Sequence, residues 1–392
     1  MIGDNHPEMI AVAKAMAEKK YSFKILLPVF FHNEELKIMR RVPKFGIFAN
    51  KRLIPQEINR SMVKRPLIIF DLLVCFFVVV KQNKRFTYFS KITESLRQLY
   101  IKIYLLTLKP DVVIVYDTFF IKKGNYRLIV IAPTVHPNAQ NKSLKNLIES
   151  IGEWPERVED LKSAANLVTI SIADRIIVLS KVAEKTFINN GINSQRIKRI
   201  PIGPKHSLVN GDPVSKTLNV YSLVFLGRIT LLKGIQDLLD LSHRLTNEFE
   251  IHLIGNCSDV MANYVSARGN SQVLQLHRNK NTHEISRIIQ KSSIMIHPSY
   301  CDGFSISCIE GMRSGLIPLF SNRSGVSEIL TGTQLERFIF EPGDVERMLS
   351  SINLLKRQEK HVLQSLSATS KELSANYSFN KFAEEFLDSI SD

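Results

Sequence analysis

The carboxylates Asp302 and Glu310 stand eight residues apart in the stretch CDGFSISCIEGMRSG (301–315). The pattern predicts a helix over about residues 304–313, with Gly315 as its C-terminal stop. Glu310 would then lie about two helical turns, or about 11 Å, beyond Asp302, too far for the two groups to share one proton. The spacing indicates that they bind hydroxyl groups at opposite ends of one elongated ligand. An N-cap role for Asp302 and a buried, paired carboxylate for Glu310 are the structural alternatives.

The loop that precedes this helix offers backbone amides. Gly303 permits a close approach of the backbone, so the amides of Gly303, Phe304 and Ser305 can face an anionic group. The loop therefore predicts a phosphate site between the two carboxylates.

A second stretch, FLGRITLLKGIQDLLDL (225–241), contributes two cations. A strand is expected to end at Gly227, with Arg228 at its tip and Lys233 at the opening of the next helix. A guanidinium fork, an ammonium and a helix N-terminus together suit a diphosphate. Taken alone, the stretch is better explained by solvated basic residues. Together with 301–315 it favours a shared phosphate site.

Short runs rich in Val, Ile and Leu must position these loops. Such runs are typical of parallel strands covered on both faces, and here they alternate with stretches of helical period, so the fold class is α/β. The expected strands are 23–30, 111–117, 127–136, 175–180, 221–228, 250–255, 273–277, 293–299, 316–322 and 337–342.

A segment rich in Pro, Gly and Ser, residues 201–219, divides the chain. We expect two doubly wound, Rossmann-like domains facing a cleft, over residues 1–205 and 206–376. The tail, 377–392, is expected to be a helix with Phe379, Phe382 and Phe386 on one stripe, and its return to the first domain is an option.

The second half of the chain resembles the nucleotide-sugar domain of retaining glycosyltransferases of the GT-B fold, in glycosyltransferase family 4 (glycosyl transferases group 1). GRITLLKG (227–234) is similar to the family element G-R-x(4)-K-G, and HPSYCDGFSISCIEGMRSGLIP (297–318) to P-S-x(3)-E-G-F-x(5)-E-A-x-A-x-G-x-P. Residues 173–203 resemble the end of the family's acceptor domain. The likeness is strong from about Asp111 to Glu341. It implies that 1–205 binds the acceptor and 206–376 the nucleotide sugar.

The resemblance also implies a role for each matching residue. Arg228 and Lys233 would neutralise the donor diphosphate, and Glu310 would bind the ribose hydroxyls. Asp302 would contact the donor sugar, and His136, in APTVHPN, would lie near the transferred sugar. A lone histidine after a strand is more often structural, so the role of His136 rests on the resemblance. The candidate catalytic residues are Arg228, Lys233, Asp302 and His136, and the candidate donor-binding residues are Gly227, Gly303, Phe304, Ser305 and Glu310.

Three features depart from the family pattern. Asp302 stands where the family has glutamate, and Gly311-Met312 stands where alanine is usual. The chain begins MIGDNHPEMIAVAKAMAEKK, without a first strand and a Gly-Gly loop before the first helix.

The implied activity is transfer of a hexose from a nucleoside diphosphate sugar to an acceptor hydroxyl, with retention of configuration and without a metal or cofactor. The sequence has no D-x-D triplet, which argues against the metal-dependent alternative fold for sugar transfer. It also lacks G-x-G and G-x(4)-G-K-[ST], the dinucleotide and P-loop patterns, and its histidines show no metal-ligand spacing.

The formal net charge of +15 is concentrated in the first part of the chain, where residues 1–110 hold 20 Lys and Arg against 8 Asp and Glu. This surplus predicts an anionic partner, such as an acidic glycan or a lipid leaflet. The apolar run 66–80 is shorter than the about 20 residues of a membrane span, so we expect a core element or an interfacial helix.

The expected location is cytoplasmic, with peripheral attachment to the inner face of the plasma membrane as an extension. The N-terminus has no secretory signal pattern, and the four scattered cysteines fit a reducing compartment. The expected acceptor is a glycan or lipid-linked saccharide in the synthesis of a bacterial surface polysaccharide.

Two alternatives stay open. One is an enzyme of the same fold with different chemistry, such as a phosphorylase or a nucleotide-sugar epimerase. The other is a catalytically lapsed domain that serves as a binding or scaffold subunit of a polysaccharide assembly complex. A nucleic-acid reader is a poorer alternative, because the basic region has no recognisable reader motif.

Overall fold

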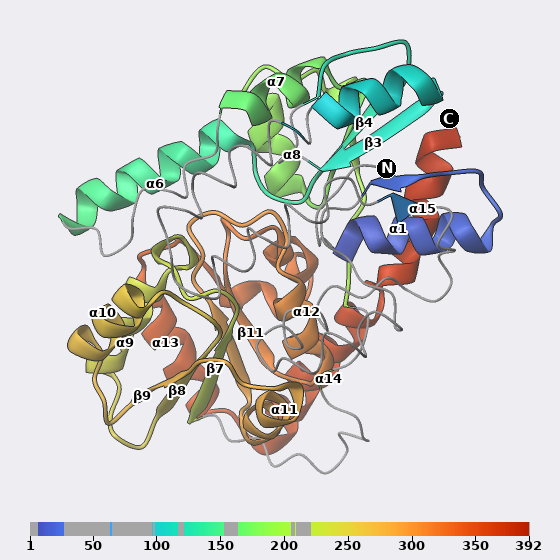
Figure 1. Ribbon diagram of the computed structural model, residues 1–392. Helices are drawn as coiled ribbons and strands as arrows, with labels where there is room; N and C mark the ends of the chain where they lie inside the picture. Colours follow the sequence, from blue (N-terminus) through green and yellow to red (C-terminus); the bar gives the residue numbers. More distant parts are fainter. Residues whose placement is uncertain are drawn as a thin grey trace, which may run out of the picture. The chain divides into compact units, whose positions relative to one another are not determined.

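The computed structural model describes residues 7–26, 63–64, 96, 99–116, 121–152, 164–204, 208 and 221–391. These residues form two compact units (Figure 1). The first contains the described residues up to Ala132, with 164–177 and 382–391, and the second contains the described residues of 133–163 and 178–381. The boundaries expected at residues 205 and 376 stay a prediction. The apolar run 66–80 and most of the segment 201–219 lie outside the described residues.

The second unit is built on a six-stranded sheet with the strand order β12-β11-β10-β7-β8-β9. All five neighbouring pairs are parallel. The sheet grows from β7 through β8 to β9 on one side, and from β10 through β11 to β12 on the other. This is the strand order of the Rossmann fold. The strands are β7 (Ser222–Leu226), β8 (Glu250–Ile254), β9 (Leu274–His277), β10 (Ile294–His297), β11 (Ile317–Ser321) and β12 (Ile339–Phe340).

Helices cover both faces of this sheet, with α9, α10 and α13 on one side and α11, α12 and α14 on the other (Figure 1). Within these layers, α9 packs against α13 and α12 packs against α14. The helices are α9 (Ile235–Arg244), α10 (Asp259–Arg268), α11 (Thr282–Lys291), α12 (Ile306–Arg313), α13 (Val345–Lys356) and α14 (Lys360–Ala375). Short 3-10 helices add η5 (Leu231–Lys233), η6 (Gly325–Leu330) and η7 (Glu336–Phe338).

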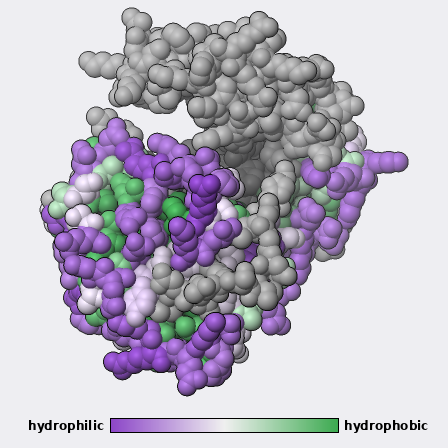
Figure 2. Space-filling view, turned by 90° about the horizontal axis from the view of Figure 1, so that it is seen from below, coloured by the Kyte–Doolittle hydropathy of each residue, from purple (hydrophilic) through white to green (hydrophobic). Residues whose placement is uncertain are grey.

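Burial explains why these segments form strands. Every residue of β7, β10 and β11 is buried, as expected for strands with helices on both faces. On the outside, the face seen from below in Figure 2 is mainly hydrophilic where it is coloured, with small groups of apolar residues. The second unit therefore has an apolar core at its sheet.

The second unit also holds segments that precede the sheet in the sequence. These are α6 (Pro137–Ile151), α8 (Lys181–Ile188), η3 (Ser194–Arg196) and β6 (Ile197–Arg199). Val178, in the same unit, accepts a hydrogen bond from the amide of Ile200 at 2.9 Å.

The first unit contains the parallel strands β3 (Val112–Tyr116) and β4 (Arg127–Ala132). The strand β5 (Arg175–Val178) lies next to β4, and its residues 175–177 belong to this unit. It also holds α1 (Pro7–Glu18), α7 (Ala164–Ile172), a helical stretch over 99–108 and a two-residue parallel pairing of β1 (Ile25–Leu26) with β2 (Val63–Lys64). Most of α15 (Phe379–Ser391) belongs to this unit, where Arg127 donates a hydrogen bond to the carbonyl of Ile390 at 3.0 Å. No helix among the described residues is both long and apolar enough to cross a membrane.

Most of the expected strands are confirmed, and the differences lie at their ends. The expected strand 337–342 is shorter, because residues 336–338 form η7 and only Ile339–Phe340 pair with β11. The expected tail helix is α15, and the side chains of Phe379, Phe382 and Phe386 are buried as the spacing predicted. The helix expected to open at Lys233 begins at Ile235 instead, because Lys233 ends η5.

Gly234 joins η5 to α9 in a conformation that favours glycine. Its φ is 78°, in the left-handed region, and a Cβ there would lie 2.0 Å from the carbonyl oxygen of Pro298, just beyond β10. The loop after β7 therefore touches the loop after β10 through bare backbone. Gly332 has a similar φ of 77°, but a Cβ added there would meet nothing within 4 Å. A comparison of the two positions therefore separates the cost of the backbone conformation from the cost of the steric clash.

We predict that Gly234→Ala lowers the melting temperature more than Gly332→Ala does. Both variants force alanine into the left-handed region, at a cost of about 1–2 kcal/mol, but only the first also pushes the two loops apart. Thermal unfolding of both purified variants beside the wild type measures this. Equal losses at the two positions would show that the contact with Pro298 is unimportant.

Candidate active site

The carboxyl ends of β7 and β10 lie next to each other although the two strands are not consecutive in the chain. From this point the sheet grows in opposite directions, and in such sheets ligands bind outside the carboxyl ends of these strands. Gly227 and Arg228 follow β7, and His297 is the last residue of β10. The two stretches that the sequence singled out therefore meet at this place.

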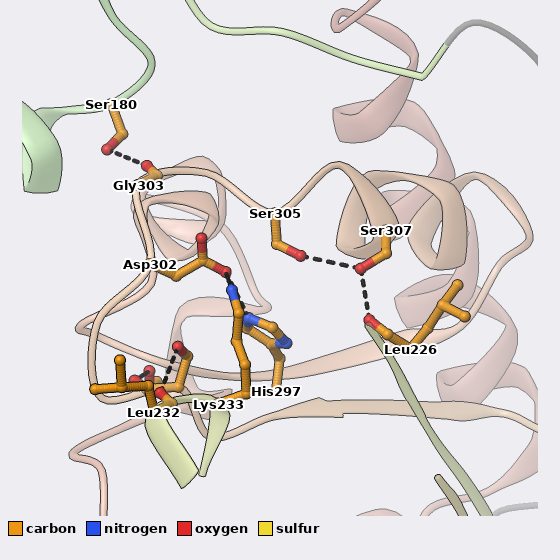
Figure 3. Close-up of polar contacts among 11 residues, drawn as sticks. Ser180, Leu226, Leu232, Lys233, His297, Asp302, Gly303, Ser305 and Ser307 are labelled. Atoms are coloured by element: carbon orange, nitrogen blue, oxygen red, sulfur yellow. Dashed lines mark hydrogen bonds and ion pairs between the residues drawn. The ribbon is translucent and has the colours of Figure 1, made fainter. Parts of the chain in front are cut away.

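Three side chains form a charged cluster there (Figure 3). The Nζ of Lys233 lies 2.5 Å from Oδ2 of Asp302, and Nε2 of His297 lies 2.9 Å from the same oxygen. The side chains of Lys233, Asp302 and His297 are 25%, 11% and 1% exposed. Asp302 thus has a cation on one side, a histidine on the other and little contact with solvent.

The charge states follow from burial and from these contacts. Burial by itself raises the pKa of Asp302, but Lys233 and His297 lower it, and the net pKa is well below the usual range. Burial lowers the pKa of His297 although Asp302 opposes this, so the ring is neutral at pH 7. An ionised carboxylate only accepts hydrogen bonds, so Nε2 of His297 carries the proton and Nδ1 the lone pair. Among the described residues, this buried Nδ1 has no hydrogen-bond partner.

The loop after Asp302 is fixed by backbone contacts on both sides. The amide of Asp302 donates to the carbonyl of Arg323, and the carbonyl of Asp302 accepts from the amide of Gly325 at 2.9 Å. Gly303 is glycine because a Cβ there would lie 2.0 Å from the carbonyl oxygen of Pro133. The residue that caps α12 is Ser305, so the alternative of Asp302 as N-cap is wrong.

Ser305 does not close the helix end with its own side chain. Its hydroxyl lies 3.0 Å from that of Ser307, which donates to the carbonyl of Leu226 at the end of β7 (Figure 3). No side chain caps the first turn of α12 from this position. The N-terminal amides of an eight-residue helix therefore stand beside the Lys233–Asp302 pair, where an anion would find both partial and full positive charge.

A chain of hydrogen bonds runs from this loop to His136. Ser180 donates to the carbonyl of Gly303 at 2.6 Å and accepts from the amide of Ala183, as the N-cap of α8. In the same helix, the hydroxyl of Thr186 accepts from the amide of His136 at 2.9 Å. One short helix therefore holds the Gly303 peptide at its start and the His136 backbone further along.

His136 itself has a structural role in the described part of the chain. Its Nδ1 accepts a hydrogen bond from the amide of Asn138 and so caps α6, and its ring packs edge-on against Phe187. The side chain is buried, and burial lowers its pKa. The predicted contact of His136 with a sugar stays a prediction.

Glu310 lies on α12, in a different setting from Asp302. Burial raises the pKa of Glu310 to about 7, although Arg313 opposes the shift. Its carboxylate has no hydrogen bond or ion pair with any residue that the structure describes, so the alternative of a paired structural carboxylate is not supported. Near neutral pH this group is poised between its two charge states.

Four residues that support the site were not identified from the sequence. His297 and Ser180 contact Asp302 and Gly303 as described above. Tyr300 donates to Asp237 of α9 at 2.9 Å, and Gly343 donates to the same carboxylate, so that Asp237 ties the loop after β10 to α9. Burial raises the pKa of Asp237 to about 6, opposed by these two hydrogen bonds. A histidine at the last position of a buried strand was the one available signal, and it points to His297.

Comparison with known proteins finds a family match over the part of the chain that contains Lys233 and Asp302. Residues 214–372 match the family model described as Glycosyl transferases group 1. An uncharacterized glycosyltransferase of Haemophilus influenzae is 23% identical over 234 residues, 58% of this chain and 64% of the relative. The lipopolysaccharide 1,6-galactosyltransferase of Salmonella typhimurium is 23% identical over 257 residues, 62% of this chain and 65% of the relative. The matches thus span less than two thirds of either relative.

Solved structures resemble the chain over nearly its whole length. Anabaena HepE, solved in complex with UDP and glucose, has a TM-score of 0.60 at 12% identity, covering 100% of this chain and 99% of that one. A sucrose-phosphate synthase of Thermosynechococcus elongatus has a TM-score of 0.63 at 12% identity, covering 97% and 91%. Likeness at such low identity establishes the fold. The chain has the GT-B fold of two Rossmann-like domains, and its residues 214–372 match the family model of glycosyl transferases group 1.

Proposed function

We propose that this protein is a retaining hexosyltransferase of glycosyltransferase family 4 that takes a nucleoside diphosphate sugar as donor and needs no metal or cofactor. The observation that carries the proposal is the meeting of Lys233, Asp302 and the N-terminus of α12 at the carboxyl ends of β7 and β10. This cluster lies inside the region that matches glycosyl transferases group 1.

The donor would lie along this edge of the sheet. Lys233 and Arg228 would neutralise the diphosphate, and the amides of Gly303, Phe304 and Ser305 would bind its oxygens. Arg228 is exposed in the loop after β7, beside Gly227, and is accessible to a ligand. Glu310 would accept hydrogen bonds from the ribose hydroxyls. Among the solved relatives, Anabaena HepE was crystallised with UDP-glucose, which makes that donor the first to test.

The Lys233–Asp302 ion pair would open when the donor binds. The diphosphate carries more negative charge than the carboxylate and would attract Lys233. Asp302 would keep its hydrogen bond from His297 and turn its freed lone pairs toward the sugar hydroxyls. One exchange of partners would thus place the cation on the leaving group and the carboxylate on the sugar.

The transfer step needs little covalent chemistry from the protein. The bond between the anomeric carbon and the β-phosphate oxygen breaks, and the acceptor oxygen bonds to the same face of the sugar. The acceptor proton passes to the departing diphosphate, and the transition state resembles an oxocarbenium ion. Lys233, Arg228 and the helix amides stabilise the charge that develops on the diphosphate, so catalysis comes mainly from positioning and electrostatics.

The acceptor would be a glycan or a lipid-linked saccharide of bacterial surface-polysaccharide synthesis, at the inner face of the plasma membrane. Support comes from the surplus of 20 basic over 8 acidic residues in 1–110 and from the relative named as a lipopolysaccharide galactosyltransferase. Anionic lipids and phosphorylated glycans attract such a surplus of positive charge.

A second candidate is a catalytically lapsed domain that binds a donor and serves as a scaffold. The observation that favours it is the shorter carboxylate of Asp302, which is already held by Lys233 and His297. Calorimetric binding of a nucleotide sugar, without release of nucleoside diphosphate on any acceptor, would support this candidate. Release of diphosphate together with sugar transfer supports the transferase.

We predict that Lys233→Ala lowers turnover by about 10²- to 10³-fold, the usual loss when one preorganised charge-stabilising group is removed. Release of nucleoside diphosphate from the donor measures this. Lys356→Ala is the matched control, because Lys356 forms a 2.6 Å ion pair with Glu248 in the same unit, and its turnover is expected to equal that of the wild type. The double variant Lys233→Ala with Asp302→Asn removes the unpaired carboxylate, so it should regain thermal stability without regaining activity. Wild-type turnover of Lys233→Ala would falsify the proposal.

We also predict that UDP-glucose binds up to about tenfold more tightly at pH 8 than at pH 6. With a pKa of about 7 in the free protein, Glu310 is mostly neutral at pH 6 and mostly ionised at pH 8, and the ionised form is the stronger acceptor for ribose hydroxyls. Calorimetry at both pH values measures the change. Glu310→Gln should flatten the dependence, whereas Glu346→Gln, an exposed carboxylate on α13, should retain it. Parallel profiles for wild type and Glu310→Gln would remove Glu310 from the donor site.

A further inference from the structure

The first unit contains a cavity that the proposed transfer chemistry does not use. It has a volume of about 770 Å³ and lies between the helical residues 99–108, drawn in cyan in Figure 1, and the loop 121–126. This volume is within the range of about 300–1,000 Å³ that is typical of pockets for small molecules.

The wall of the cavity is largely apolar. Leu99, Leu105, Leu106 and Ile121 contribute side chains to it. Leu99 and Leu106 remain 54% and 66% exposed, one above the other on the same helix face at a spacing of seven residues. Apolar side chains left in contact with water around a cavity favour an aliphatic occupant.

The charged residues in the described part of the lining are basic. Lys102, Lys109, Lys122 and Lys123 line the cavity, and its described lining contains no aspartate or glutamate. Lys123 forms an ion pair with Asp174. The structure shows no acidic partner among its described residues for Lys102, Lys109 or Lys122. Three ammonium groups beside an apolar wall favour an occupant with an anionic head, and phosphate is the head that lysine binds as a point charge.

We propose that this cavity binds a single amphiphile, with its aliphatic chain against Leu99 and Leu106 and its phosphate among the lysines. The neighbouring sequence agrees with an anionic ligand, because residues 1–110 carry 20 basic and 8 acidic residues. The role we assign to the amphiphile, as the lipid carrier of the acceptor, rests on the proposed function. The binding itself does not.

The test uses dodecyl phosphate below its micelle concentration, with binding measured by calorimetry on the full chain. We expect saturable binding that weakens with added salt, at least tenfold weaker binding of dodecyl maltoside, and no detectable binding of inorganic phosphate at the same concentration. Equal binding of the phosphate and maltoside amphiphiles would overturn the role of the lysines. Binding of inorganic phosphate as strong as that of dodecyl phosphate would overturn the role of the apolar wall.

Matched variants locate the site. Leu106→Asp and Lys102→Glu should each weaken dodecyl phosphate binding at least tenfold. Ile103→Asp is the control, since Ile103 is 53% exposed on the same helix but does not line the cavity, and it should bind like the wild type. Melting curves of the two aspartate variants should agree, which shows that the loss in Leu106→Asp is not unfolding. If Ile103→Asp loses as much affinity as Leu106→Asp, or if the protein binds phosphatidylglycerol vesicles but not monomeric dodecyl phosphate, the site is a surface and the cavity proposal is wrong.

The two proposals fail separately. Leu106→Asp should bind UDP-glucose as the wild type does, because the predicted donor contacts lie in the second unit. A wild-type protein that binds dodecyl phosphate but no nucleotide sugar would overturn the proposed function and leave the cavity assignment standing. The opposite result would overturn the cavity assignment alone.

Discussion

The ion pair between Lys233 and Asp302 is the interaction on which the candidate site depends. It joins residues that are 69 positions apart in the sequence, and His297 holds the same carboxylate oxygen from inside the sheet. Both side chains are largely shielded from solvent, so each charge needs the other as its partner until a ligand takes the place of that partner. The loops after β7 and β10 are therefore held together by charge as well as by the close backbone contact at Gly234.

The sheet topology explains why this pair can form. Because β7 and β10 are neighbours while the chain continues away from them on opposite sides, their carboxyl ends are not covered by a connection between the two strands. Short loops then suffice to bring a lysine, a carboxylate and a helix N-terminus to one place. Tyr300 and Asp237 add a second connection, between the loop after β10 and α9. The strand order thus determines where the site lies, and the buried polar contacts fix the positions of its side chains.

Much of the second unit could be predicted from sequence, because its strands are continuous apolar runs that end in glycine, proline or charged residues. The stretches around Lys233 and Asp302 could be assigned to one ligand for the same reason. The pairing of Lys233 with Asp302 could not be foreseen, since it depends on which strands are neighbours and on a neutral histidine at the end of β10. The start of α12 moved from Phe304 to Ile306 because the Gly303 loop is held by Ser180 and by the backbone of residues 323–325. The predictions for residues 27–62 and 65–95 concern parts of the chain outside the described residues.

Helix α8 connects the Gly303 loop to the backbone of His136. Ser180, the N-cap of α8, donates a hydrogen bond to the carbonyl of Gly303, and Thr186 of α8 accepts one from the amide of His136. All of these residues belong to the second unit. A helix of eight residues is stiff over this length, so a shift of the Gly303 or the His136 peptide would move α8 as a whole. If a ligand at the Gly303 loop shifted this helix, the shift would reach the backbone of His136, and thermodynamic linkage would make any resulting change in binding free energy equal in both directions.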